Sequence, residues 1–257
     1  MATPAKGLFI GRVQLGPVPR VVLCVTDARG GRLPPRCTPD LIEARVDLFR
    51  QHTPEYVQNI LRKLRRSGYP VIATIRQATE GGRWRGSNRD RELLFRAVLP
   101  LVDAVDVELS SRTLAARVVE CAHAEGRPVI VSAHDLDRTP PATTLASRIM
   151  TARKQLGADV VKLAAYANDV EDLSVLLRVL LSHPGVPLVM LAMGPVGTMS
   201  RILFAAAGSL LTYAFAKSDA PVAPGQLPIN ELQAELARYC RPYRALRRQR
   251  VARRDPR

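Results

Sequence analysis

Short apolar segments alternate with longer amphipathic ones along most of this chain. Each apolar segment has the length of a single strand and is rich in Val, Ile, Leu and Ala. Segments that are apolar at nearly every position are typical of strands in a parallel sheet whose faces are both covered. The predicted strands are residues 21–25, 41–46, 71–75, 104–109, 129–132, 159–163, 188–192 and 209–215.

Between these strands, apolar residues recur every three or four positions, which is the period of a helix with one buried face. In the clearest example, Val57, Ile60, Leu61 and Leu64 fall on one stripe. The predicted helices are residues 53–67, 90–99, 112–125, 141–156, 172–181, 196–207 and 229–239. The stretch 27–40 reads DARGGRLPPRCTPD, and its Gly and Pro residues predict a loop where the first helix would stand.

This alternation predicts an α/β protein with a (β/α)8 TIM barrel, in which the helix after strand 1 is reduced or missing. A doubly wound open sheet is the alternative, but no G-x-G-x-x-G or P-loop pattern follows an early strand. Residues 8–16 alternate weakly and predict an N-terminal hairpin across one end of the barrel. We expect residues 1–240 to form a single barrel domain and residues 241–257 to form a basic Arg-rich tail.

The formal net charge of +15 raises the question of a nucleic-acid or anionic partner. Residues 241–257 contain eight Arg and one Asp, so nearly half of the charge lies in one short segment. The few aromatic residues that could stack on bases are scattered along the chain. We therefore interpret the tail as a solvated basic segment and do not expect nucleic-acid binding.

Three further classes of protein are disfavoured. Residues 179–200 lack Asp, Glu, Lys and Arg, but three Pro and three Gly in this stretch predict a helix end, a strand and loops instead of a membrane helix. The N-terminus has no long apolar core, so we expect no signal peptide and a cytoplasmic protein. The four Cys show no C-x-x-C spacing, and no Asp, Glu or His trio has metal-ligand spacing, so we expect no metal.

Polar residues gather where the predicted strands end, which is where (β/α)8 barrels place their chemistry. In chain order these residues are Thr26, Glu43, Arg45, Asp47, Arg76, Glu80, Asp106, Glu108, Ser132, His134, Asp135, Lys162, Arg201 and Gln226. Glu43 and Arg45 share one face of strand 2, where they could form a buried ion pair or contact a ligand. The arginines suggest an anionic, hydroxyl-rich ligand, because guanidinium groups match carboxylates.

Lys162 is the most informative of these residues because it stands in the largely apolar strand GADVVKLAAY. Burying an ammonium group is costly, and covalent catalysis is one reason for it. Desolvation and nearby Arg cations would favour the free amine that attacks a ketone. A lysine that reaches solvent from a strand end explains the position equally well. His134, at the end of the preceding strand, is a candidate acid/base.

Eight segments in register resemble the type I 3-dehydroquinate dehydratases. They are GLFIGRVQLG, EARVDLF, VIATIRQATEGG, VDVEL, VIVSAHD, GADVVKLA, GPVGTMSRILFAAAGSLLTYAFA and APGQLPINEL. The resemblance covers residues 8 to about 238. Its most specific parts are S-x-H-D, K-x-A, G-x-x-S-R and the APGQ lid.

The resemblance implies a (β/α)8 barrel that acts as a homodimer without metal or cofactor and converts 3-dehydroquinate to 3-dehydroshikimate and water in the shikimate pathway. It implies that Lys162 forms the Schiff base, that His134 is the general acid/base, and that Glu80 steadies the histidine. The implied substrate-binding residues are Thr26, Glu43, Arg45, Arg76, Arg201 and Gln226.

The sequence departs from the family pattern at two places. The helix after strand 1 is replaced by residues 27–40, and Val222 stands where the lid of the family has Ser, four residues before Gln226. Two other functions remain open at this point. One is another class I Schiff-base barrel lyase or aldolase, and the other is a non-catalytic barrel that binds anions or nucleic acid.

Overall fold

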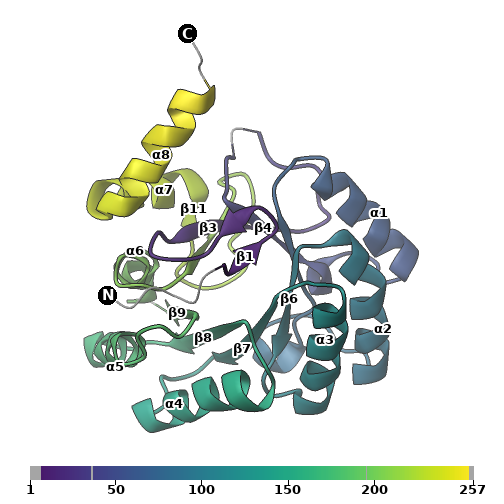
Figure 1. The fold of residues 1–257 in the computed structure, drawn as a ribbon, viewed down its shortest axis with the longest axis horizontal. Coiled ribbons are helices and arrows are strands. Elements are labelled where there is room, and N and C mark those ends of the chain that lie inside the picture. Colours follow the sequence, from purple (N-terminus) through teal and green to yellow (C-terminus); the bar gives the residue numbers. More distant parts are fainter. Residues whose placement is uncertain (1–6, 36, 195, 255–257) are drawn as a thin grey trace.

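Eight parallel strands form the wall of a barrel in the computed structural model, which describes residues 7–35, 37–194 and 196–254, with side chains up to residue 249 (Figure 1). Neighbouring strands pair in chain order from β3 to β9, while β10 pairs with β3 and the short β11 (Leu227–Pro228) pairs with β10. The wall strands are β3 (Arg20–Val25), β4 (Leu41–Arg45), β5 (Val71–Thr74), β6 (Ala104–Glu108), β7 (Val129–Asp135), β8 (Val160–Tyr166), β9 (Leu188–Met193) and β10 (Leu211–Phe215).

The sheet closes between β9 and β10 through a short contact instead of a full ladder. The backbone N–H of Leu210 donates to the carbonyl of Leu188 at 3.0 Å, and the N–H of Met190 donates to the hydroxyl of Ser209 at 3.0 Å. β10 starts at Leu211, two residues later than predicted, because its ladder with β3 begins there. The predicted barrel is confirmed, and the open sheet is excluded.

Helices surround the barrel (Figure 1), and all except α8 lie where the 3.6-residue period predicted them. They are α1 (Pro54–Arg65), α2 (Asn88–Val98), α3 (Arg112–Ala124), α4 (Ala142–Met150), α5 (Val170–Leu181), α6 (Ser200–Ala206), α7 (Ile229–Tyr239) and α8 (Arg241–Arg254). Short helical turns are η1 (Val46–Leu48), η2 (Ala78–Glu80), η3 (Leu99–Leu101), η4 (Thr151–Gln155) and η5 (Gly197–Met199). None of the helices in the described ranges has both the length and the apolar character needed to cross a bilayer.

Alternation along the strands separates two apolar cores. Leu23 and Ala44 face outward and pack between the strands and the helices, whereas Val22 and Cys24 face the barrel interior. The predicted N-terminal hairpin is confirmed as β1 (Phe9–Ile10) and β2 (Val13–Gln14), which pair antiparallel. Ile10 and Leu15 are buried in the interior core, so the hairpin closes one end of the barrel.

The segment between β3 and β4 has no helix in its described residues, as predicted; Arg36 lies outside the description. This segment is held by buried aspartates at its two ends. Asp27 accepts hydrogen bonds from the backbone of Arg50 at 2.9 Å and from the hydroxyl of Tyr56 at 2.6 Å. Asp40 accepts one from the backbone of Val21 at 2.7 Å. The loop is thus anchored at both ends without a helix.

The basic segment after residue 240 differs from the expected solvated tail. It begins as α8, which lies beside α7 (Figure 1). Tyr243 is 1% exposed and belongs to the outer core, and Leu246 packs against the same core. The prediction is wrong for these two side chains, because their spacing of three residues puts both on the helix face that meets the barrel. Arg241 and Arg248 are exposed.

Candidate active site

A cavity of about 100 Å³ opens where the barrel strands end, and charged and polar side chains line much of it. It brings together all the predicted site residues except Thr26. These are Glu43, Arg45, Arg76, Glu80, His134, Lys162, Arg201 and Gln226. Because side chains two residues apart share a face of a strand, β4 contributes Glu43 and Arg45 together.

Lys162 projects from β8 and is 5% exposed. Its Nζ lies 2.9 Å from Oδ2 of Asp106 and 3.5 Å from Oε1 of Glu43. The same nitrogen lies 4.4 Å from the centroid of the Tyr213 ring, within the range of a cation–π interaction. The expected arginine neighbours are present, since Arg76 binds the other oxygen of Asp106, but the charged groups in direct contact with this amine are carboxylates.

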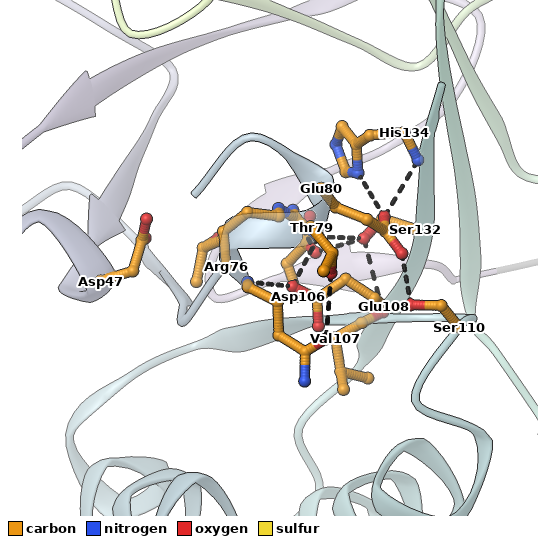
Figure 2. A network of polar contacts seen from close by, with 12 residues as sticks. Asp47, Arg76, Thr79, Glu80, Asp106, Val107, Glu108, Ser110, Ser132 and His134 are labelled. Atoms are coloured by element: carbon orange, nitrogen blue, oxygen red, sulfur yellow. Dashed lines mark hydrogen bonds and ion pairs between the residues drawn. The ribbon is translucent and has the colours of Figure 1, made fainter. Parts of the chain in front are cut away.

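Asp106 connects Lys162 to a buried network of polar side chains that includes Arg76 and Ser132. Figure 2 shows this network around Asp106. Its Oδ1 accepts hydrogen bonds from Arg76 at 2.7 Å and from the hydroxyl of Ser132 at 2.6 Å. Burial raises the pKa of Asp106, but Arg76 and Lys162 outweigh burial and hold the pKa below its usual value. Asp106 is therefore a buried anion with both oxygens occupied.

Arg76 occupies the centre of this network (Figure 2). It donates to the hydroxyl of Ser132 at 2.6 Å and lies 3.4 Å from Oε1 of Glu108. Burial lowers the pKa of Arg76, but the carboxylates of Asp106 and Glu108 outweigh it and raise the pKa above its ordinary value. Arg76 consequently stays charged. Its guanidinium links β6 and β7, because it binds Asp106 on one strand and Ser132 on the other.

His134 and Glu80 form a second pair that lines the same cavity (Figure 2). Oε2 of Glu80 accepts from the backbone N–H of His134 and contacts its Nδ1, each at 3.0 Å. Ser110 donates to the other oxygen of Glu80. Burial raises the pKa of Glu80, whereas burial together with the cations Arg76 and Lys162 lowers the pKa of His134 well below its ordinary value.

These contacts determine which nitrogen of the His134 imidazole carries the proton. An ionised Glu80 only accepts hydrogen bonds, so Nδ1 of His134 carries the proton and Nε2 is left with a lone pair. A neutral imidazole with one free nitrogen is a competent general base.

Glu43 and Arg45 do not pair with each other. Glu43 accepts from the hydroxyl of Thr74 at 2.9 Å, while Arg45 donates to both oxygens of Asp47, at 2.9 and 2.8 Å. Burial lowers the pKa of Arg45, but the hydrogen bond with Asp47 outweighs it and raises the pKa. The buried ion pair considered from the sequence therefore forms between Arg45 and Asp47, at the start of η1.

Arg201 and four residues of the lid segment 221–226, which are Val222, Ala223, Pro224 and Gln226, also line the cavity. Arg201 is 2% exposed and donates to the carbonyl of Pro224 at 3.2 Å, and its Nε has no partner among the described residues. Burial lowers its pKa to about 10, so it remains charged at neutral pH. Oε1 of Gln226 accepts from the backbone N–H of Val222 at 2.9 Å, while its Nε2 lies 3.5 Å from Sγ of Cys24.

Thr26 is a correction to the predicted site. It is not among the described residues that line the cavity, and its hydroxyl accepts from the backbone N–H of Ala28 at 3.3 Å. The physical reason is that β3 ends at Val25, so Thr26 turns into the following loop. Cys24 faces the interior from this strand instead, with its Sγ 3.2 Å from Oε2 of Glu43.

Asp106 is a buried partner of Lys162 to which the sequence assigned no role. Its position two residues before Glu108, in a strand of buried residues, places both carboxylates on the same face. That spacing indicated an inward carboxylate, but the pairing of Asp106 with Lys162 depends on strands 56 residues apart.

Comparison with known proteins identifies the family. The Type I 3-dehydroquinase family profile matches residues 35–239. This chain belongs to that family. The 3-dehydroquinate dehydratase of Methanosarcina acetivorans is 38% identical over 205 residues, covering 76% of this chain and 83% of the relative. That of Aquifex aeolicus is 33% identical over 193 residues, covering 75% of this chain and 84% of the relative.

Solved structures of the family share the fold. The type I 3-dehydroquinate dehydratase of Clostridium difficile, solved with covalent modified comenic acid, is 28% identical, with a TM-score of 0.81. The match covers 89% of this chain and 95% of that one. The Geobacillus kaustophilus 3-dehydroquinate dehydratase is 28% identical, with a TM-score of 0.78 and coverage of 91% and 96%.

Proposed function

We propose that this type I 3-dehydroquinase family member converts 3-dehydroquinate to 3-dehydroshikimate and water through a Schiff base on Lys162. The reaction is a step of the shikimate pathway of aromatic amino-acid biosynthesis. One observation carries the proposal: a buried amine and a neutral histidine line the same cavity in a chain of this family.

The covalent step uses the amine of Lys162. The nitrogen adds to the ring ketone, and loss of water from the adduct leaves a protonated imine. This cation draws electrons from the neighbouring carbon and so makes its C–H bond acidic. Asp106 at 2.9 Å and Glu43 at 3.5 Å stabilise the positive charge at this nitrogen.

His134 carries out the proton transfers. Its free Nε2 removes the proton from the carbon beside the imine, and Glu80 stabilises the imidazolium that results. The same imidazolium then gives the proton to the departing hydroxyl, which leaves as water. Water hydrolyses the imine, which releases the enone product and restores Lys162. One water is consumed and two are released, so the net change is one dehydration.

The remaining residues orient the substrate. Arg201 is a buried cation whose Nε has no partner in the described ranges, so it is suited to the substrate carboxylate. Glu43, Arg45 and Arg76 form the wall that faces the ring hydroxyls. Gln226 has a free Nε2–H for the ligand apart from its long contact with Cys24.

The test combines turnover with trapping. Purified protein is mixed with 3-dehydroquinate, and absorbance at the enone band of the product is followed. Borohydride added with substrate is expected to inactivate the enzyme and leave the reduced ligand mass on the Lys162 peptide. Lys162→Met is expected to lose both adduct and turnover. Absence of turnover in folded wild-type protein, or activity only on aldolase substrates, would contradict the proposal.

Three finer properties remain predictions that rest on the family resemblance and the sequence. We expect a homodimer, which light scattering on the purified protein would test. We expect no metal or cofactor requirement, so activity should survive extensive chelation and dialysis. We also expect a cytoplasmic enzyme without nucleic-acid affinity, which cell fractionation and a salt-dependent shift assay would check.

A further inference from the structure

Tyr213 on β10 carries a buried hydroxyl that nothing in the described protein satisfies. The side chain is 2% exposed, and its Oη has no hydrogen-bond partner among the described residues. Buried polar groups are hydrogen-bonded in the large majority of cases, and leaving one unpaired destabilises the protein. The unpaired hydroxyl of Tyr213 therefore indicates a hydrogen-bond partner that is not part of the described protein.

The position of Tyr213 indicates which partner that is. Tyr213 lines the cavity together with Lys162 and Arg201, and the Lys162 Nζ lies 4.4 Å from its ring centroid. It pairs in register with Val22, whose side chain belongs to the interior core. A phenylalanine would supply the same ring to the core and to the ammonium group. Packing therefore accounts for the ring of Tyr213 but not for its hydroxyl.

The charge state of the Tyr213 phenol further limits which groups of a ligand its hydroxyl can bind. Burial raises the pKa of Tyr213 well above its ordinary value, and the nearby carboxylates of Glu43 and Asp106 raise it further. The group is therefore a neutral phenol that both donates and accepts a hydrogen bond. Such a group matches an alcohol, whereas the substrate carboxylate is matched by the cation of Arg201.

We propose that the hydroxyl of Tyr213 hydrogen-bonds a ring hydroxyl of the substrate held at Lys162, and that this hydroxyl is one that the product retains. Tyr213 is then a specificity-determining residue of the cavity. The inference rests on the proposed function, because it takes 3-dehydroquinate as the ligand.

The first test compares Tyr213→Phe with a matched control. In the ligand-free protein the substitution removes an unpaired hydroxyl, so Tm is expected to stay equal or rise. With 3-dehydroquinate, kcat/KM is expected to fall about two- to ten-fold, the value of one net hydrogen bond. Tyr243→Phe removes a buried phenol hydroxyl on α8, outside the cavity lining, and is expected to leave kcat/KM unchanged. A merely structural role for Tyr213 predicts instead that Tm falls.

The second test identifies the substrate group. Analogues of 3-dehydroquinate that lack the 4- or the 5-hydroxyl are assayed with wild-type protein and Tyr213→Phe. The fall in kcat/KM caused by Tyr213→Phe is expected to vanish for the analogue that lacks the partner hydroxyl and to persist for the other analogue. Unchanged kcat/KM for 3-dehydroquinate in Tyr213→Phe, or an equal penalty with both analogues, overturns the inference. A wild-type protein without turnover overturns the proposed function instead.

Discussion

The amine of Lys162 and the carboxylate of Asp106 lie 2.9 Å apart in the barrel interior. Asp106 is fully buried, and its second oxygen is already bound by Arg76 and Ser132. This carboxylate therefore has little freedom to rotate away from the amine. It holds the nitrogen in one place, and in the proposed mechanism it would stabilise the iminium cation.

Asp106→Asn is expected to slow Schiff-base formation at least ten-fold and to destabilise the fold. The amide cannot neutralise the buried cations Arg76 and Lys162, and removing one partner of a buried pair costs about 3–5 kcal/mol. Borohydride trapping at a series of reaction times measures the rate of Schiff-base formation. Urea unfolding measures the change in stability. Asp40→Asn, a buried aspartate remote from the cavity, is the control and should alter stability alone. Trapping at the wild-type rate in folded Asp106→Asn would contradict this role.

His134→Ala is expected to separate imine formation from turnover. Lys162 is still present, so borohydride continues to trap an adduct, but proton transfer is lost and turnover falls about 10²–10⁴-fold. The steady-state rate and the mass of the trapped peptide are measured on the same sample. Near-normal turnover in this variant would remove His134 from the mechanism.

The lowered pKa of His134 predicts the pH dependence of both activity and stability. We expect kcat/KM to stay level as the pH falls from neutrality through 6.5, because the base is still unprotonated. The unfolded state takes up this proton near pH 6.5 while the folded state does not, so the free energy of unfolding decreases below pH 6.5.

His134→Asn removes this titration. The loss of stability between pH 7 and 5, followed by urea unfolding, is expected to be smaller in the variant than in wild type. An acid limb of kcat/KM at or above pH 6.5 would show instead that the histidine is not held neutral.

Val222→Ser is expected to raise kcat/KM for 3-dehydroquinate by up to about ten-fold. Val222 lines the cavity, and a hydroxyl there would add one hydrogen bond of about 0.5–1.5 kcal/mol. Gln226→Ala is the opposing variant and is expected to lower kcat/KM, because it removes the amide that lies beside Val222. If serine leaves the kinetics unchanged or worse, the lid does not bind substrate as its relatives do.

Two truncations within the basic segment are expected to behave differently. Removal of residues 244–257 keeps Tyr243 and should leave the kinetic constants within a few-fold of wild type. Removal of residues 241–257 also deletes this buried side chain, and should lower the free energy of unfolding by a further ~1.5–3 kcal/mol. Denaturant unfolding and steady-state kinetics of the pair test both statements. Loss of activity in a folded 244–257 deletion would show that the segment supports the site.

Much of the fold and of the candidate site follows from the local pattern of apolar and polar residues. The predicted helix 229–239 matches α7, because Ile229, Leu232 and Leu236 repeat at helical spacing and meet one core. The polar residues that close the strands converge in one cavity, since parallel strands in a barrel all present the same ends to one side. Motifs in register along the sequence indicate the family, and the family profile confirms it.

Other features depend on which segments meet in space. Thr26 leaves the site because the strand stops one residue before it, and Tyr243 is buried because α8 packs back on the barrel. The carboxylate neighbours of Lys162 come from strands distant in sequence, so no local pattern specifies them. Periodicity determines which face of an element is apolar, whereas hydrogen-bond partners and charge states depend on distances that only the closed barrel sets.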